Sequence, residues 1–244
     1  MKRTLTIAGL ALALTIVLAP AAFAQPLQWT NKGFVNFTLG AQAPSQDLAT
    51  NTTFDLYNEQ AILSTTQDVG GGLFFDISVG YKVWRNLTVG AGFSRVGSST
   101  DLVVNAQIPD PDFFDSPRLV STTASDAKHS QPAIHLTGTW MMPITDKVDV
   151  GFQFGPSIFM VSQDLPTAIS VSEPGPTINS LNVTSVDKTT VGLHFGVDFT
   201  YLVTPRIGAG VLARYSWGSA DLEGADDSLT VGGFQIGGGI RYRF

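Results

Sequence analysis

Ionisable side chains in this sequence recur at alternate positions among apolar ones, so a β-strand would place them together on one face. The predicted set is Asp76, Lys82, His135, Asp149, His194, Asp198, Arg214, Arg241 and Arg243. Such residues can line a polar pore or a proton-linked gate. They can also fill the interior of a small barrel with ion pairs, because buried charges must be paired. We favour the filled interior, since a barrel of about eight strands is just filled by its own side chains.

Two histidines in this set raise the alternative of an enzyme. His135 and His194 share the polar face with Asp149 and Asp198, which is compatible with a lipid A-modifying acyl hydrolase. However, no nucleophile motif surrounds any serine, and a site acting on lipid should open toward the bilayer rather than inward. We therefore expect no catalytic residue, and the hydrolase is the least favoured function.

The elements that position these side chains are predicted strands. Apolar and polar residues alternate strictly through 73–84, 191–201 and 234–244, which indicates β-structure. The apolar face is rich in large aromatic residues, and the other face carries glycine, small polar and charged residues. This distribution is typical of a barrel with lipid outside and a polar interior.

The same alternation predicts eight strands. Their expected ranges are 33–42, 72–84, 86–98, 131–142, 147–160, 189–203, 205–217 and 229–244. Tight turns at 84–86, 143–146 and 203–205 alternate with long connections at 43–71, 99–130, 161–188 and 218–228. We therefore predict an all-β fold, an eight-stranded antiparallel up-and-down transmembrane β-barrel with short periplasmic turns and long extracellular loops.

Two stretches within the long connections are themselves strand-like. Residues 53–66 and 101–108 have this character, and a turn is expected at 109–112. Strands could therefore project beyond the bilayer as hairpins. A ten-stranded barrel, with 53–67 as an added strand, is the alternative.

The N-terminus predicts export. Lys2 and Arg3 precede an apolar run from Leu5 to Leu18, and small residues at 22–24 resemble a cleavage site. The run is shorter than the roughly 20 residues of a spanning helix. We expect a cleaved signal peptide over 1–24, a barrel domain over 25–244, and a location in the outer membrane of a Gram-negative type bacterium.

Composition excludes several other classes of protein. The absence of cysteine removes disulfides and thiolate metal sites, and a net charge of −6 argues against nucleic-acid binding. Acidic residues are concentrated in the long connections, where we interpret them as a solvated surface. A specific Ca²⁺ or Mg²⁺ site there is the alternative. We expect no cofactor and no metal.

The C-terminal residues, Gly237 to Phe244, carry a resemblance. Gly239, Tyr242 and Phe244 match the terminal signal of bacterial outer-membrane proteins, whereas Gly237 replaces its usual polar residue. Together with the strand pattern, the chain resembles the small outer-membrane β-barrels of the OmpA/OmpX type. The resemblance implies that the last strand is read by the barrel-assembly machinery. We expect no peptidoglycan-binding domain after the barrel.

The expected function is that of a non-enzymatic integral outer-membrane barrel with a structural or surface-interaction, adhesion-like role. Expected partners are outer-membrane lipid and lipopolysaccharide, the barrel-assembly machinery, and an extracellular ligand bound through the loops. Phe113 and Phe114 form an apolar pair inside an acidic loop and are a candidate contact point. A narrow porin-like channel for small solutes is the alternative.

Overall fold

The computed structural model describes residues 28–43, 46–69, 71–221 and 228–244, so the expected signal peptide lies outside the described residues. No helix in this described part is long and apolar enough to cross a membrane. The strands are β1 (Gly33–Gln42), β2 (Gln46–Leu56), β3 (Glu59–Val69), β4 (Gly72–Trp84), β5 (Leu87–Ile108), β6 (Arg118–Thr145), β7 (Val148–Ser172), β8 (Thr177–Leu202), β9 (Ile207–Ala220) and β10 (Leu229–Arg243).

Eight of these strands close into a ring, as predicted. The order is β1-β4-β5-β6-β7-β8-β9-β10, every neighbouring pair is antiparallel, and β10 pairs back onto β1. Closure matters because lipid offers no partners to backbone N–H and C=O groups at an open sheet edge. The ten-stranded alternative is wrong: β2 and β3 form a hairpin that joins the sheet only where β3 pairs with the outer part of β5.

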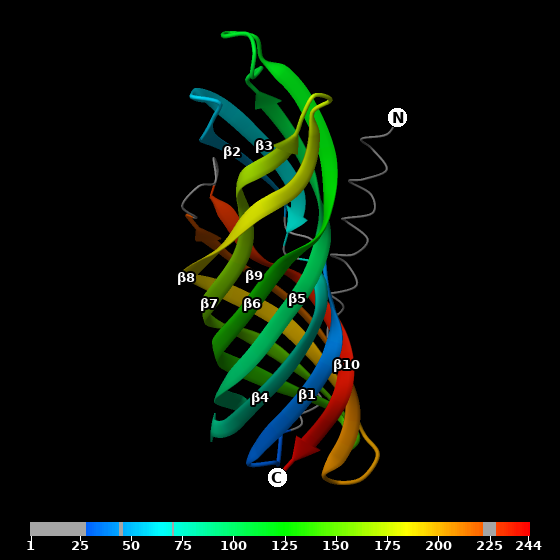
Figure 1. Cartoon of the computed structure of the whole chain (residues 1–244). Coiled ribbons are helices and arrows are strands. Elements are labelled where there is room, and N and C mark those ends of the chain that lie inside the picture. Colours follow the sequence, from blue (N-terminus) through cyan, green and yellow to red (C-terminus); the bar gives the residue numbers. More distant parts are fainter. Residues whose placement is uncertain (1–27, 44–45, 70, 222–227) are drawn as a thin grey trace, which may run out of the picture.

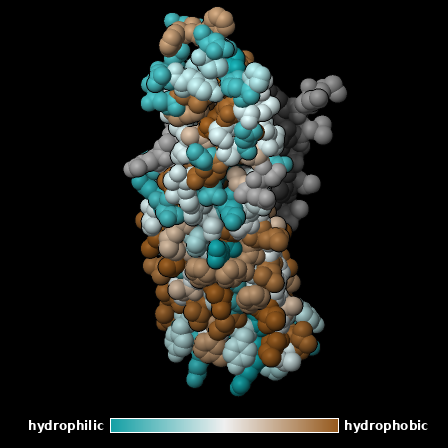
Figure 2. Space-filling model, in the orientation of Figure 1, coloured by the Kyte–Doolittle hydropathy of each residue, from teal (hydrophilic) through white to brown (hydrophobic). Residues whose placement is uncertain are grey.

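The outer wall of the ring carries an apolar belt. Along β8 the exposed side chains at alternate positions are Val191, Leu193, Phe195, Val197, Phe199 and Tyr201. On the face seen in Figure 2, the belt covers the half of the molecule that ends at the C-terminus (Figure 1). Exposed Trp84, Trp140 and Tyr242 lie near the strand ends at the periplasmic side, where aromatic residues anchor a barrel at the membrane interface.

Four strands continue far beyond this belt. Strands β5 to β8 contain 22, 28, 25 and 26 residues, whereas about 9–11 residues suffice to cross a bilayer. Much of the predicted connections 99–130 and 161–188 is therefore strand, which confirms the projecting hairpins. Pairing between β6 and β7 stops at His129 and Gln163, and beyond this point the β7–β8 ribbon separates from the β2-β3-β5-β6 sheet (Figure 1).

In this extension the apolar side chains point inward, whereas in the belt they point outward. Its buried core consists of Ala61, Leu63, Leu102, Val104, Ala106, Ile108, Val120 and Ile169. Polar side chains such as Asn51, Ser64 and Ser121 face outward instead. The extension is thus a small β-sandwich with a water-facing surface. The interior of the extension is mainly apolar, and the buried polar groups Thr50, Thr65 and Gln67 lie among these side chains.

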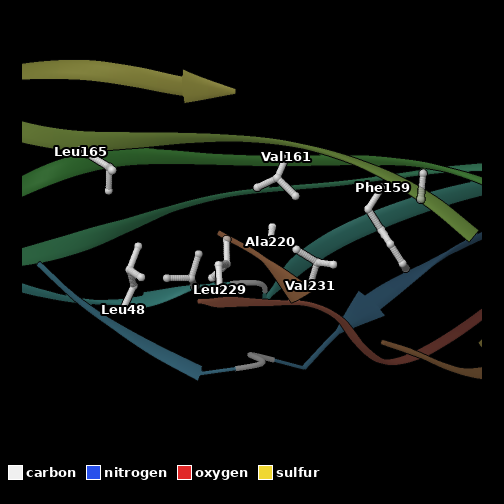
Figure 3. Close-up of a cluster of buried hydrophobic side chains, with 9 residues drawn as sticks. Leu48, Phe159, Val161, Leu165, Ala220, Leu229 and Val231 are labelled. Atoms are coloured by element: carbon white, nitrogen blue, oxygen red, sulfur yellow. The ribbon is translucent and has the colours of Figure 1, made fainter. Parts of the chain in front are cut away.

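A second apolar cluster fills the neck between the barrel and the sandwich. Its members are Leu48, Val69, Ala133, Phe159, Val161, Leu165, Ala220, Leu229 and Val231 (Figure 3). Strand β10 enters the neck at Gly232, whose φ of 97° disfavours any residue with a side chain. A Cβ there would also lie 2.2 Å from the carbonyl oxygen of Ser216. The neck therefore separates the polar lumen from the sandwich with a layer in which these apolar side chains pack beside the buried amides of Gln131 and Gln163.

Candidate functional site

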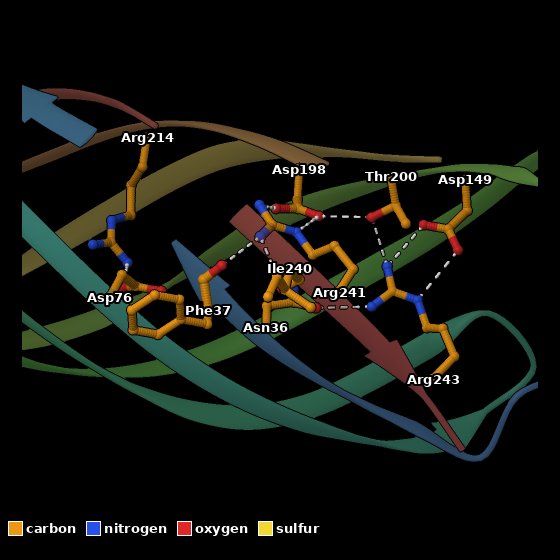
Figure 4. A network of polar contacts seen from close by, with 10 residues as sticks. All are labelled: Asn36, Phe37, Asp76, Asp149, Asp198, Thr200, Arg214, Ile240, Arg241 and Arg243. Carbon is orange, nitrogen blue, oxygen red and sulfur yellow. Dashed lines mark hydrogen bonds and ion pairs between the residues drawn. The ribbon is translucent and has the colours of Figure 1, made fainter. Parts of the chain in front are cut away.

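Three buried ion pairs cross the lumen of the barrel (Figure 4). Arg241 on β10 binds Asp198 on β8 through two bonds, with Nη2–Oδ2 2.6 Å and Nε–Oδ1 3.0 Å. The other pairs are Arg243–Asp149, with Nη2–Oδ1 3.0 Å, and Arg214–Asp76, with Nη1–Oδ2 2.8 Å. All six side chains are at most 6% exposed. The pairs connect β10 and β9 with strands two or three positions away around the ring.

Neutral polar groups complete this network. Thr200 donates to Asp198 at 3.0 Å and accepts from Arg243 at 2.7 Å, which joins two of the ion pairs. Arg243 also donates to Asn36 at 2.8 Å. Arg214 donates through Nε to Gln235 at 2.8 Å. Buried charges stabilise a fold only when their remaining hydrogen-bonding groups are satisfied, and these contacts supply many of those partners.

The two histidines belong to a separate hydrogen-bond chain above the ion pairs. Ser157 Oγ lies 2.7 Å from Nδ1 of His135 and 2.8 Å from Nδ1 of His194. The outer ring nitrogens contact Ser94 Oγ at 2.8 Å and Thr137 Oγ1 at 3.1 Å. The single hydroxyl proton of Ser157 can be donated to only one ring, so the other ring must donate its own N–H to Ser157. With one proton on each ring, all hydrogen bonds of this series point in the same direction.

This arrangement differs from that of a hydrolase. Asp149 and Asp198 bond to arginines, and among the described residues neither histidine bonds to a carboxylate. Ser157 has no exposed surface. The cavity that reaches His135 and Arg214 has a volume of about 10 Å³, whereas one water needs roughly 10–15 Å³. An acyl chain therefore has no path to Ser157 in this structure.

Lys82 lies apart from the rest of the predicted set. Its Nζ donates to the carbonyl of Trp29 at 2.9 Å and stands 5.9 Å from the centre of the Trp29 ring. Trp29 packs with Phe34 and Met141 at the periplasmic mouth. The structure thus brings the other eight predicted residues into the lumen and places Lys82 at its entrance.

The sequence-based candidate set did not include the neutral members of the lumen. These are Asn36, Gln42, Ser94, Thr137, Ser157, Thr200 and Gln235. The signal was available, because each occupies an inward position of a predicted strand.

Access to the lumen is limited at both ends. At the periplasmic end an open bowl of about 550 Å³ with a mixed polar and apolar lining reaches as far as Asp149. Beyond Asp149 the three ion pairs occupy the interior, and the apolar neck follows them. Among the described residues, no group of three or more His, Asp or Glu side chains could hold a metal ion.

The C-terminal residue completes the seam between β10 and β1. The carbonyl of Phe244 accepts from Lys32 at 2.6 Å and from Gly33 at 3.0 Å, and its N–H donates to Gly33 at 3.1 Å. The Phe244 ring stacks with Tyr242 at a centroid distance of 6.2 Å. At Gly239 a Cβ would lie 1.9 Å from the carbonyl of Phe37, so only glycine fits. Recognition of Gly239, Tyr242 and Phe244 by the barrel-assembly machinery remains a prediction.

Deletion of Phe244 is expected to slow folding into membranes and to lower the yield at a fixed time. It removes three backbone hydrogen bonds at the seam, each worth about 1 kcal/mol. The measurement is the appearance of the compact, heat-modifiable band on gels during assembly. Phe244→Leu keeps the backbone bonds and separates the effect of the aromatic ring. Assembly of the deletion at the wild-type rate would refute the prediction.

A closed antiparallel ring with an apolar outer belt and a polar, filled lumen defines the class: the fold is that of an outer-membrane β-barrel. No protein-family model matches the sequence, and no curated protein matches it.

Several solved outer-membrane proteins are similar to the chain. Neisserial surface protein A is 13% identical, with a TM-score of 0.47 over 87% of this chain and 97% of that one. OprG from Pseudomonas aeruginosa is 11% identical, with a TM-score of 0.47 over 88% and 96%. The outer-membrane protease OmpT from Escherichia coli is 11% identical, with a TM-score of 0.49 over 89% and 98%. The fold assignment rests on the strand ring itself, and these similarities assign no activity.

Proposed function

We propose that the chain is a non-enzymatic protein of the bacterial outer membrane that displays an extracellular β-sandwich for contact with other molecules. The observation that supports this role is the division of the structure into a filled barrel and a projecting sandwich. The lumen is filled with ion pairs and capped by the apolar neck, whereas ordered strands continue beyond the belt. A filled lumen disfavours the narrow channel. A packed sandwich core favours a defined outer surface.

Polar contacts fasten the turns at the far end of the sandwich. The guanidinium of Arg118 binds both carboxylate oxygens of Glu173, with Nη1–Oε2 2.9 Å, and donates to the carbonyl of Pro109 at 3.0 Å. Tyr57 donates to Glu173 at 3.3 Å. These contacts join the β2–β3, β5–β6 and β7–β8 turns. The apex is therefore one connected surface rather than three separate hairpins.

The apex presents an apolar pair to solvent. Phe113 and Phe114 are 69% and 80% exposed, outside the membrane belt. Asp110, Asp112 and Asp115 surround them in the same turn. Exposed aromatic side chains within a charged rim are typical of protein contact sites. The ligand that fits best is a protein surface with an apolar pocket bordered by basic residues.

The test is attachment of bacteria that carry the chain to cultured epithelial monolayers. We expect wild-type cells to attach more than cells lacking the chain, and Phe113→Ser/Phe114→Ser to abolish the gain at equal surface display. Leu119→Ser, which removes a side chain 81% exposed on the nearby strand β6, is the matched control and should attach like wild type. Equal attachment by all strains, or steady single-channel openings of the purified protein in planar bilayers, would contradict the proposal.

Acid should loosen the apex. The hydrogen bond from Arg118 holds the pKa of Glu173 below its ordinary value of 4.5. Because the folded pKa is lower than the unfolded one, the contribution of this contact is complete above pH 4.5 and is lost as pH falls through the folded value. Amide exchange at the three turns, corrected for intrinsic pH dependence, should rise at acidic pH. Glu173→Gln should show the faster exchange already at pH 7, and identical exchange in variant and wild type would refute the prediction.

A further inference from the structure

Arg95 occupies an unusual place on the outer wall. Along β5 the outward residues Val89, Ala91 and Phe93 belong to the apolar belt, and Arg95 is the first polar side chain on the extracellular side. It is exposed, and it makes no hydrogen bond or ion pair within the described part of the chain. A guanidinium remains charged at any relevant pH. At the edge of hydrocarbon it is therefore open to pair with an anion from outside the protein.

Two apolar grooves adjoin this arginine. One, of about 440 Å³, is lined mainly by Val35, Ile77, Val79, Ala91, Phe93 and Ile134. The other, of about 400 Å³, is lined by Leu39, Leu73, Phe74, Phe75, Arg95 and Gly97. The rings of Phe75 and Phe93 stand between them, 5.8 Å apart.

Small residues create the grooves. Ala91 and Gly92 lie in the floor of the first groove. Gly97 lies in the second, and a Cβ there would meet no atom within 4 Å. Dry apolar space facing a membrane is filled by hydrocarbon chains, because water has no polar partners there. Two adjacent grooves on either side of an aromatic pair thus fit more than one acyl chain.

From this geometry we infer that Arg95 and its two grooves form a binding site for a phosphorylated, multiply acylated glycolipid of the outer leaflet. A phosphate group pairs with the guanidinium through charge-assisted hydrogen bonds. The acyl chains lie in the grooves on either side of Phe75 and Phe93. The position of Arg95 on the extracellular side of the belt selects the outer leaflet, whose anionic lipid is lipopolysaccharide. The inference rests on the outer-membrane placement proposed above and gives that lipid contact a location.

The experiment is a lipid titration of the purified, folded protein in non-ionic detergent, with bound lipid counted by native mass spectrometry. The probes are bisphosphorylated lipid A, the same lipid without phosphates, and phosphatidylglycerol. We expect the tightest binding for bisphosphorylated lipid A. Arg95→Gln should weaken that binding about tenfold, as expected for loss of a charge-assisted contact.

Two further variants separate charge from shape. Gly97→Leu places a side chain in the second groove, where its Cβ would meet no atom within 4 Å, and should weaken binding of both lipid A forms. Lys128 is an exposed residue of β6 that lies opposite Ser99 of β5 in the strand register, farther from the belt than Arg95. Lys128→Gln removes its charge and should leave binding unchanged.

Equal binding by Arg95→Gln and wild type would overturn the inference, as would equal binding of the dephosphorylated lipid or of phosphatidylglycerol. Because the titration is done in detergent, such a result would leave the membrane placement intact. That placement is tested separately by fractionation of the outer membrane.

Discussion

Asp198→Ala should lower the free energy of unfolding by about 3–5 kcal/mol, the usual cost of leaving one partner of a buried ion pair uncompensated. Arg241 has no exposed surface, and its Nε and Nη2 both bond to Asp198. Without that carboxylate its charge stays in the lumen, and Thr200 loses its acceptor. Urea unfolding of the barrel in detergent micelles or lipid vesicles measures the change.

The control for this prediction removes both charges. Asp198→Leu combined with Arg241→Met should recover part of the loss, because two apolar residues need no partner in the lumen. The comparison separates an uncompensated charge from a simple packing defect. A single Asp198→Ala variant as stable as wild type would contradict the prediction and show that water solvates Arg241 or that a rearranged carboxylate pairs with it.

Val197→Arg should destabilise the barrel by about 2–4 kcal/mol, as found for arginine on the lipid face near the bilayer midplane. Val197 points outward from β8, about midway between Val191 and Tyr201 at the two ends of the apolar run. The guanidinium of an arginine at this position lies in hydrocarbon and must move toward the membrane–water interface. The measurement is the unfolding free energy in lipid vesicles.

The same substitution at the border of the belt provides the control. Val191 is on the same strand and face and is 68% exposed. Val191→Arg should cost only about 0–1 kcal/mol, because its side chain reaches the interface. Equal costs at positions 191 and 197 would show that the belt has been placed wrongly on the strand.

The sequence predicted the ring because alternation is a local property. The strand expected at 72–84 is β4, Gly72–Trp84, and its inward residue Asp76 is buried as expected. The β2–β3 hairpin was only partly anticipated. Its turn residues, Tyr57 and Asn58, have φ values of 53° and 64° without the glycine that usually marks such a turn.

Partners across the lumen were beyond prediction. Arg214 meets Asp76 at a sequence separation of 138 residues, and such a pairing depends on the stagger of all strands between them. Alternation also assigns residues to two faces without saying which medium each face meets. For this reason Val104 and Phe159, which point into the sandwich and the neck, were not recognised as core residues.

The outward-facing serine, threonine and asparagine residues of the sandwich contribute little to its core. Because surface substitutions away from such cores usually change stability by less than about 0.5 kcal/mol, these positions can vary freely. A lineage under attack by antibodies would then be able to replace most of its visible epitopes one residue at a time. The buried side chains of Leu63, Val104 and Ile169 would meanwhile keep the same scaffold beneath them.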